Sequence, residues 1–187
     1  LPSIVKDLRA LGTPVTVTLS DFHPNQQSIQ SFQSDPYITY EPKPIDATDV
    51  PVNHKGLRTM IGAFHHLERD SAKNMLLNAQ TDRQSVAVFE AFGRNLQSFL
   101  ALLPSVVMAF FLIPLIRPFR IVNLIFTYLL PVVPLLVFFD GWISFLRIYS
   151  PEELHEMIDE LPKGTGYTWE IGTLGIQKAP YIIGMPE

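Results

Sequence analysis

The sequence contains no cysteine among its 187 residues. Disulfides, thiolate zinc sites, iron–sulfur clusters and cysteine nucleophiles are therefore excluded. Charge is also scarce: charged residues make up 17% of the chain, against a usual share of about 25%, and the net charge is −4. Since nucleic-acid-binding domains carry a basic surface, we expect no nucleic-acid partner.

Charge is missing altogether from residues 99–116 and 121–139, which are separated by Arg117-Pro-Phe-Arg120. Each run is long enough to cross a hydrocarbon core roughly 30 Å thick. We therefore expect a helical hairpin in contact with membrane lipid, although a buried core helix is the alternative. The hairpin could span the bilayer or dip into one leaflet, with the arginines reaching headgroups. Prolines make broken helices expected in this region: Pro104, Pro114, Pro118, Pro131 and Pro134.

Residues 1–94 have the pattern of an ordinary α/β protein. The chain opens on an amphipathic helix that Gly12 should end. Because there is neither an initiator Met nor a signal peptide, we expect a processed chain or a fragment. Strands alternating with helices predict a Rossmann-like, doubly wound, largely parallel sheet. The strands are expected at residues 15–19, near residue 38, at 56–64 and at 84–90, with a helix at 70–83.

The C-terminal part, residues 150–187, should complete this α/β domain. Ser150 and Glu153 form a capping-box pattern at the start of an amphipathic helix. Residues 166–174 and 180–186 are close enough in sequence to pair as an antiparallel hairpin. The sequence thus predicts three parts: an α/β part (1–94), an apolar membrane-associated helical insertion (95–149) and a completing helix and β-hairpin (150–187).

Polar residues follow the predicted strands at the edge where an open α/β sheet binds ligands. Asp21 ends the strand VTVTLS and could accept hydrogen bonds from ribose hydroxyls, although a turn aspartate is the simpler interpretation. Asp46-Ala47 lies in a later loop, where a carboxylate could accept from an adenine amino group and the next amide could donate to the ring. A simple turn fits this pair of residues equally well.

Two adjacent histidines, His65 and His66, directly follow the strand GLRTMIGAF. Their side chains point in different directions, so they do not form a natural two-ligand metal site, and we expect no metal. One of them could act as a general base or contact the substrate. Alternatively, one holds the loop and the other is solvated. Glu90, at the end of SVAVFE, is a candidate substrate contact at the same edge.

The order of these motifs resembles class I S-adenosylmethionine-dependent methyltransferases, beginning after their first strand. More narrowly, LSDFHPN, DATDVP, GLRTMIGAFHHL, the RPFR segment and DGWISFLRIYSPEEL resemble a bacterial group of methyltransferase-like proteins with an apolar insertion. The resemblance implies that Asp21 binds the ribose of S-adenosylmethionine, that Asp46 and Ala47 hold its adenine, and that His65 and His66 face the acceptor pocket. The family's first strand and its glycine-rich loop are absent, and no GxGxxG-like run occurs anywhere in this sequence.

We therefore expect a membrane-associated methyltransferase acting on a small or lipid-like acceptor, if the glycine-rich segment is supplied. The alternative is a catalytically inactive accessory subunit of a larger membrane complex. The strands at 15–19 and 57–64 should each border one further strand, contributed by an upstream segment or a partner chain, unless they pair with each other. The resemblance implies a bacterial or organelle inner membrane, with the globular part on the cytoplasmic or matrix side.

Overall fold

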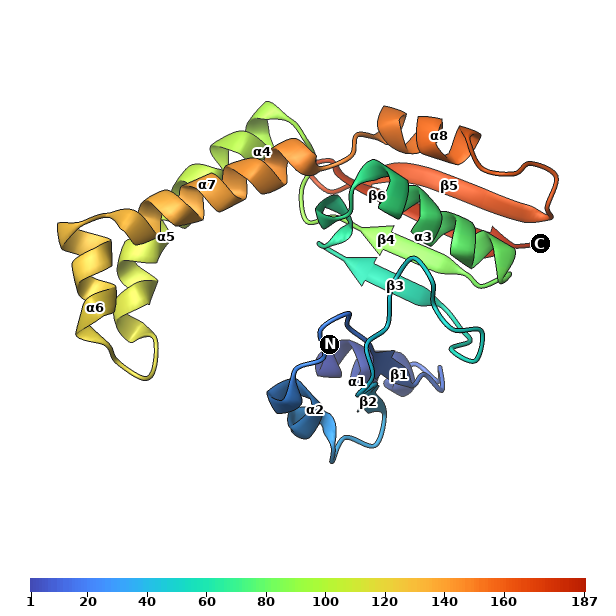
Figure 1. Ribbon diagram of the computed structural model, residues 1–187, viewed down its shortest axis with the longest axis horizontal. Coiled ribbons are helices and arrows are strands. Elements are labelled where there is room, and N and C mark those ends of the chain that lie inside the picture. Colours follow the sequence, from blue (N-terminus) through green and yellow to red (C-terminus); the bar gives the residue numbers. More distant parts are fainter. The chain divides into compact units, whose positions relative to one another are not determined.

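The computed structural model describes residues 1–187, which divide into two units, Leu1–Lys55 and Gly56–Glu187 (Figure 1). The boundary between them falls inside the stretch 1–94, which the sequence pattern treats as one part.

The first unit is built on two parallel strands joined by a helix. Strand β1 (Val17–Leu19) pairs with β2 (Ile38–Tyr40), so that Val17 lies opposite Ile38, and helix α2 (Gln26–Phe32) connects them. Parallel neighbours need such a crossover, because a tight turn reverses the chain direction. Both strands are short, but each begins within two residues of its predicted position.

Helix α1 (Pro2–Ala10) opens this unit. Gly12 follows it with a φ of +87°, a conformation that residues with side chains rarely adopt, and this confirms the predicted end of the helix. The Arg9 guanidinium lies 3.7 Å from the centre of the Tyr37 ring and donates a hydrogen bond to the Val15 carbonyl at 2.8 Å. These contacts attach α1 to the residues that precede β1 and β2.

The second unit contains a mixed sheet of four strands in the order β3-β4-β6-β5. Strand β3 (Arg58–Ile61) runs parallel to β4 (Val86–Phe89). Strand β6 (Ala179–Pro186) is antiparallel both to β4 and to β5 (Tyr167–Leu174). The predicted C-terminal hairpin is therefore confirmed, and its second strand joins the hairpin to the parallel pair.

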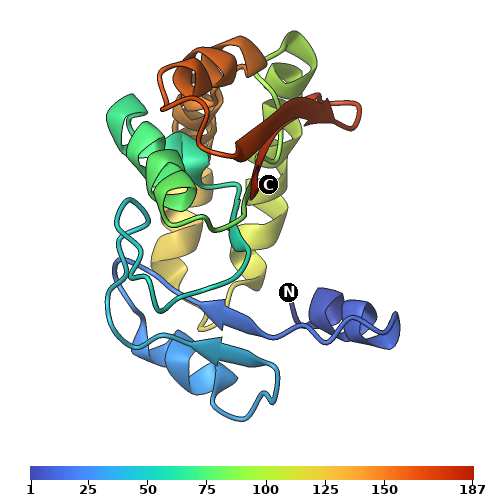
Figure 2. The same ribbon diagram turned by 90° about the vertical axis from the view of Figure 1, so that its right-hand side faces the viewer.

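Helices α3 (Arg69–Thr81) and α8 (Pro151–Asp159) lie on the same side of this sheet, as the green and orange helices in Figure 2 show. The Lys73 ammonium pairs with the Glu160 carboxylate at 2.8 Å, which joins the two helices at the surface. The core between these helices and the sheet is formed by fully or almost fully buried side chains: Ala72, Leu76, Val86, Val88, Met157 and Ile182. The structure thus confirms the α/β class predicted from the sequence. This sheet is not largely parallel, because one of its strand pairs is parallel and two are antiparallel.

Strand β3 lies at one edge of the four-stranded sheet, and β1 and β2 are both edge strands of the two-stranded sheet. The hydrogen-bonded neighbour of β1 is β2, and that of β3 is β4. The side chains of Leu57, just before β3, and Ile61, its last residue, are 61% and 69% exposed. An exposed apolar edge strand presents unpaired backbone groups that another strand could use.

The segment of the chain between β4 and α8 forms a helical hairpin that projects from the sheet (Figure 1). Its first leg, Leu96–Leu115, is one helix that is long and apolar enough to cross a membrane. Only 11% of its most apolar 18-residue stretch is buried within the protein. The second leg is broken, with a bend of 74° between Ile121–Leu129 and Val132–Arg147. The legs contain α4 (Leu96–Leu100), α5 (Leu102–Leu112), η2 (Ile113–Leu115), α6 (Ile121–Leu124), the π-helical η3 (Ile125–Leu129) and α7 (Val132–Arg147).

Candidate functional site

His65 and Glu90 meet at the carboxyl ends of β3 and β4. His65 lies in a short 3-10 turn, η1 (Phe64–His66), after β3, and Glu90 directly follows β4. Because these strands are parallel neighbours, their carboxyl ends lie at one edge of the sheet. The Glu90 Oε1 accepts a hydrogen bond from the His65 backbone N–H at 2.9 Å, and Oε2 lies 2.9 Å from the imidazole Nδ1.

Both side chains of this pair are buried, with exposed fractions of 7% for His65 and 5% for Glu90. An ionised Glu90 only accepts hydrogen bonds, so the proton of the neutral imidazole lies on Nδ1. Nε2 then carries the lone pair and is the atom that could accept a proton from another group.

The turn that carries His65 is held on both sides. Phe64 is buried and makes an edge-to-face contact with the Tyr149 ring, with the centroids 5.5 Å apart. The Tyr149 hydroxyl donates to the Leu67 carbonyl at 2.8 Å, and burial raises the pKa of Tyr149. The turn is therefore fixed by Tyr149, which lies two residues after the end of the hairpin.

His66, the second predicted catalytic histidine, is exposed. Its ring lies against that of His65, with centroids 4.3 Å apart and planes inclined by 37°. The two histidines therefore occupy different environments: one is buried and held by a carboxylate, and the other faces solvent. A general base needs a fixed orientation, and the contact with Glu90 gives one to the His65 ring.

In the first unit, Asp21 and Asp46 lie on two loops that contact each other. The Ile45 N–H donates to the Asp21 carbonyl at 2.9 Å, which joins the loop after β1 to the loop after β2. Asp21 Oδ1 accepts a hydrogen bond from the His23 N–H at 2.8 Å. This bond is the one that a turn aspartate makes, and it occupies one of the two carboxylate oxygens.

Asp46 is also used locally. Its Oδ1 accepts from the Thr48 N–H at 2.8 Å and from the Thr48 hydroxyl at 2.7 Å. These two bonds, the backbone one first, hold the pKa of Asp46 below its ordinary value. Ala47 is half-buried inside this turn, which the Asp49 N–H closes by donating to the Asp46 carbonyl at 3.1 Å.

The six predicted residues thus form two groups. Asp21, Asp46 and Ala47 share one edge of the first unit, and His65, His66 and Glu90 share one edge of the second. Sequence reasoning missed the direct pairing of Glu90 with His65 and assigned Glu90 to the substrate. The signal was available, because both residues directly follow strands that were predicted to be parallel.

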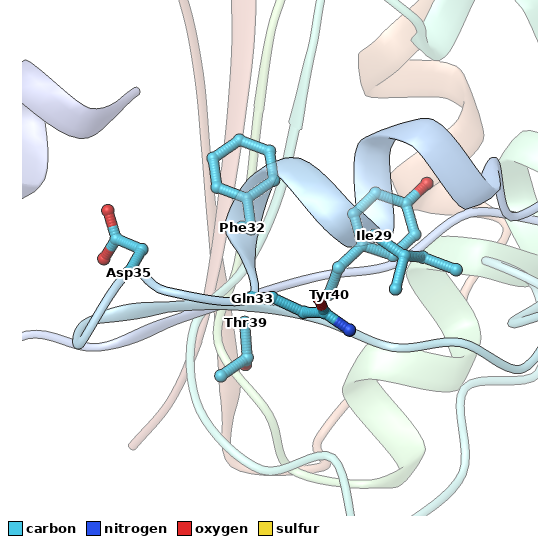
Figure 3. Close-up of a pocket in the computed structure, with 6 residues that line it drawn as sticks. All are labelled: Ile29, Phe32, Gln33, Asp35, Thr39 and Tyr40. Carbon is cyan, nitrogen blue, oxygen red and sulfur yellow. The ribbon is translucent and has the colours of Figure 1, made fainter.

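An open, shallow hollow lies in the first unit between α2 and β2 (Figure 3). Its lining includes Asp35, whose Oδ1 accepts from the N–H groups of Tyr37 and Ile38 at 2.9 Å each. The Asp35 carboxylate therefore stabilises the turn before β2. None of the predicted site residues lines the hollow, which is formed by Ile29, Phe32, Gln33, Asp35, Thr39 and Tyr40.

No group of three or more His, Asp or Glu side chains is arranged to hold a metal ion. The sequence matches no protein-family model, and it matches no curated protein.

Proposed function

We propose that this protein is a membrane-associated, methyltransferase-like protein that uses S-adenosylmethionine to methylate a small or lipid-like acceptor. The observation that carries the proposal is the position of the polar residues. In each unit they follow the carboxyl ends of parallel strands, where open α/β sheets bind ligands. A Rossmann-like arrangement of the class I methyltransferase type fits the strand order of both units, with β1 and β3 as the two strands that would border the family's first strand.

The residues present fit one end of the cofactor. The contact between the Asp21 and Asp46 loops supports a site in which Asp21 would bind the ribose hydroxyls and the Asp46–Ala47 turn would hold the adenine. The Asp21 oxygen that does not bind the His23 N–H is the one proposed for ribose. For the methionine end, the sequence offers no glycine-rich run.

When bound, S-adenosylmethionine supplies an electrophilic methyl group. The contribution of this chain would be to orient the acceptor and to remove its proton. We assign proton removal to His65 Nε2, because Glu90 fixes the tautomer and offsets the charge that develops on the ring. His66, which is exposed beside this ring, would contact the acceptor.

The exposed hairpin supplies the membrane part of the proposal. An apolar or lipid-like acceptor partitions into the bilayer, so attachment through residues 96–147 would concentrate it near the sheet edge. The legs begin and end close to the histidine turn, since α4 starts a few residues after Glu90 and Tyr149 contacts Phe64.

A second candidate function is that of an accessory subunit without catalysis. It is favoured by the edge strands β1 and β3, which another chain could extend, and by the turn bonds that already engage Asp21 and Asp46. In this alternative, the His65–Glu90 pair stabilises the fold and transfers no proton to or from a substrate.

Calorimetric titration of the full chain in detergent with S-adenosylmethionine tests the proposal. Saturable binding heat, together with methyl transfer to an extract of membrane lipids, would support the enzyme. Binding without transfer would limit the proposal to cofactor binding. The absence of binding heat at millimolar cofactor would favour the accessory subunit.

A further inference from the structure

The bend in the second leg of the hairpin limits how deeply the hairpin can enter a membrane. Between α6–η3 and α7 the chain turns by 74° (Figure 1). If α7 stood upright in a bilayer, the distance along its axis from Val132 to Asp140, eight residues further on, would be ~12 Å at 1.5 Å per residue. The other arm, Ile121–Leu129, would then lie nearly flat and add only ~4 Å of depth. The uncharged part of the leg, residues 121–139, would therefore cover about half of the roughly 30 Å core.

The charges of the hairpin lie at both ends of this bent leg. Arg117 and Arg120 precede α6, whereas Asp140 and Arg147 lie on the part of α7 nearest the sheet. An upright, spanning hairpin would therefore place either Asp140 or the arginines in hydrocarbon, which is unfavourable for a charged group. A bilayer-spanning hairpin does not match this distribution of charge.

A V-shaped orientation resolves the conflict. In this orientation each arm makes an angle of half of the 74° bend with the membrane plane. At 1.5 Å per residue, Asp140 then lies ~7 Å and Arg120 ~8 Å closer to the membrane surface than the bend. Both ends then lie at nearly the same height. This depth matches the 5–10 Å to which interfacial helices bury their apolar faces. Trp142, beside Asp140, also falls in the layer that tryptophan prefers.

The residues at the bend have the properties that burial in lipid requires. Leu129 is 75% exposed, among the most exposed apolar side chains of the protein, and Leu130 is 52% exposed. The Leu130 N–H donates to the Ile125 carbonyl at 2.8 Å, the Val132 N–H donates to the Leu130 carbonyl, and Pro131 has no N–H to satisfy. The N–H groups of the bend are thus paired within the chain, as hydrocarbon demands.

The first leg follows the second around the bend. The Tyr128 hydroxyl donates to the Phe110 carbonyl, and the two rings lie 5.8 Å apart. Nearer the sheet, the Phe99 and Trp142 rings meet edge to face at 5.1 Å. Because contacts on both sides of the bend join the legs, we expect the hairpin to enter lipid as one body.

We propose that residues 96–147 form a wedge that enters and leaves one leaflet of a lipid bilayer through the same headgroup layer. Leu129–Leu130–Pro131 is its deepest point. Arg117 and Arg120 contact the headgroups at one end, and Asp140 with Arg147 does so at the other. This inference rests on the membrane attachment in the proposed function, and it does not depend on cofactor binding.

Because the natural chain has no cysteine, single cysteines can report the side and depth of each part. The full chain carrying Phe119→Cys, Leu130→Cys or Glu156→Cys is added to sealed vesicles of phosphatidylcholine and phosphatidylglycerol, followed by a membrane-impermeant maleimide. Glu156 is an exposed residue of α8 and is the control. We expect outside reagent to label Phe119→Cys and Glu156→Cys, whereas Leu130→Cys should react at least tenfold more slowly until detergent is added.

Three results would overturn the wedge. Labelling of Phe119→Cys only by reagent trapped inside the vesicles would mean that the hairpin spans the bilayer. Equal reactivity of Leu130→Cys and Glu156→Cys on bound protein would mean that the bend stays outside the lipid. Failure of the natural chain to float with vesicles would mean that another protein covers the hairpin, and it would also remove the membrane part of the proposed function.

A second measurement does not depend on cysteine chemistry. In a chain carrying Trp142→Phe and Trp169→Phe, Leu129→Trp places the only tryptophan at the bend, while Trp169→Phe alone leaves only Trp142. Lipids brominated deep in the acyl chain should quench the tryptophan at 129 at least twice as strongly as Trp142. Equal or weaker quenching at position 129 would also overturn the proposal.

Discussion

The carboxylate of Glu90 binds His65 at two points, the backbone N–H and the imidazole Nδ1, each at 2.9 Å. One side chain thus fixes both the position of the turn after β3 and the rotation of its histidine ring. Because both residues are almost completely buried, neither partner of the contact is readily replaced by water.

Removing this carboxylate should destabilise the fold. Glu90→Ala leaves a buried N–H and a buried ring nitrogen without their acceptor, and we expect the free energy of unfolding to fall by about 2–3 kcal/mol. Glu90→Gln keeps one oxygen for the His65 N–H and should lose less. Urea unfolding in mild detergent, followed by tryptophan fluorescence, measures both. Equal stability of the Ala variant and the natural chain would contradict the role assigned to Glu90.

If the chain binds S-adenosylmethionine, Asp21→Ala should weaken that binding most among the residues present. Loss of charge-assisted hydrogen bonds to ribose corresponds to about 2–3 kcal/mol, or roughly 30- to 150-fold in the dissociation constant. Calorimetry gives the constant directly. Asp7→Ala, which removes an exposed carboxylate from α1 of the same unit, is the matched control. An unchanged constant for Asp21→Ala would remove Asp21 from the site.

Asp46 should titrate below the ordinary aspartate range because Thr48 donates two hydrogen bonds to its carboxylate. A carboxyl group whose pKa is lowered by folding stabilises the protein above its unfolded pKa of about 3.9, and this contribution is lost as the pH falls through the folded value. Thr48→Ala removes only the hydroxyl bond, so the pKa of Asp46 should rise part of the way. Carboxyl-carbon NMR titration checks this, and an unchanged pKa would contradict it.

The Ser150 side chain caps α8, and Ser150→Ala should cost about 1 kcal/mol of stability. Its hydroxyl accepts from the Glu153 N–H at 3.3 Å, while Glu153 Oε2 accepts from the Ser150 N–H at 2.7 Å. Thermal or urea unfolding measures the loss. Ser150→Thr keeps the hydroxyl, so its loss of stability should be at most about half of that of Ser150→Ala. An equal loss of stability in both variants would mean that the capping hydroxyl contributes little.

The elements that could be predicted are those encoded by local chemistry. Ser150 and Glu153 predicted a helix start from four residues alone, and the structure contains both reciprocal bonds of the capping box. Gly12 predicted a helix end in the same way, through its left-handed backbone. The C-terminal hairpin followed from two alternating strands separated by a short loop.

Features that depend on distant partners could not be predicted as well. The pairing of His65 with Glu90 depends on the register of β3 with β4, which places residues far apart in sequence at one edge. The division at Lys55 falls in a loop that resembles other proline-containing loops of the chain. Prolines indicated a broken hairpin, but neither the 74° bend nor the π-helical turn η3 before Pro131 has a local signal in the sequence.

The place where the hairpin joins the sheet has a consequence for protein engineering. The Arg94 guanidinium pairs with the Glu153 carboxylate at 2.9 Å, so the residues just before the first leg and just after the second are tied together. The legs themselves meet at Phe99 and Phe145, with ring centroids 5.7 Å apart. The chain therefore leaves and rejoins the sheet at nearly one point, and a short loop in place of residues 96–147 closes the gap without moving a strand. Such a shortened chain, which keeps residues 1–95 and 148–187, retains both partners of the Glu90–His65 contact and the tyrosine that holds their turn.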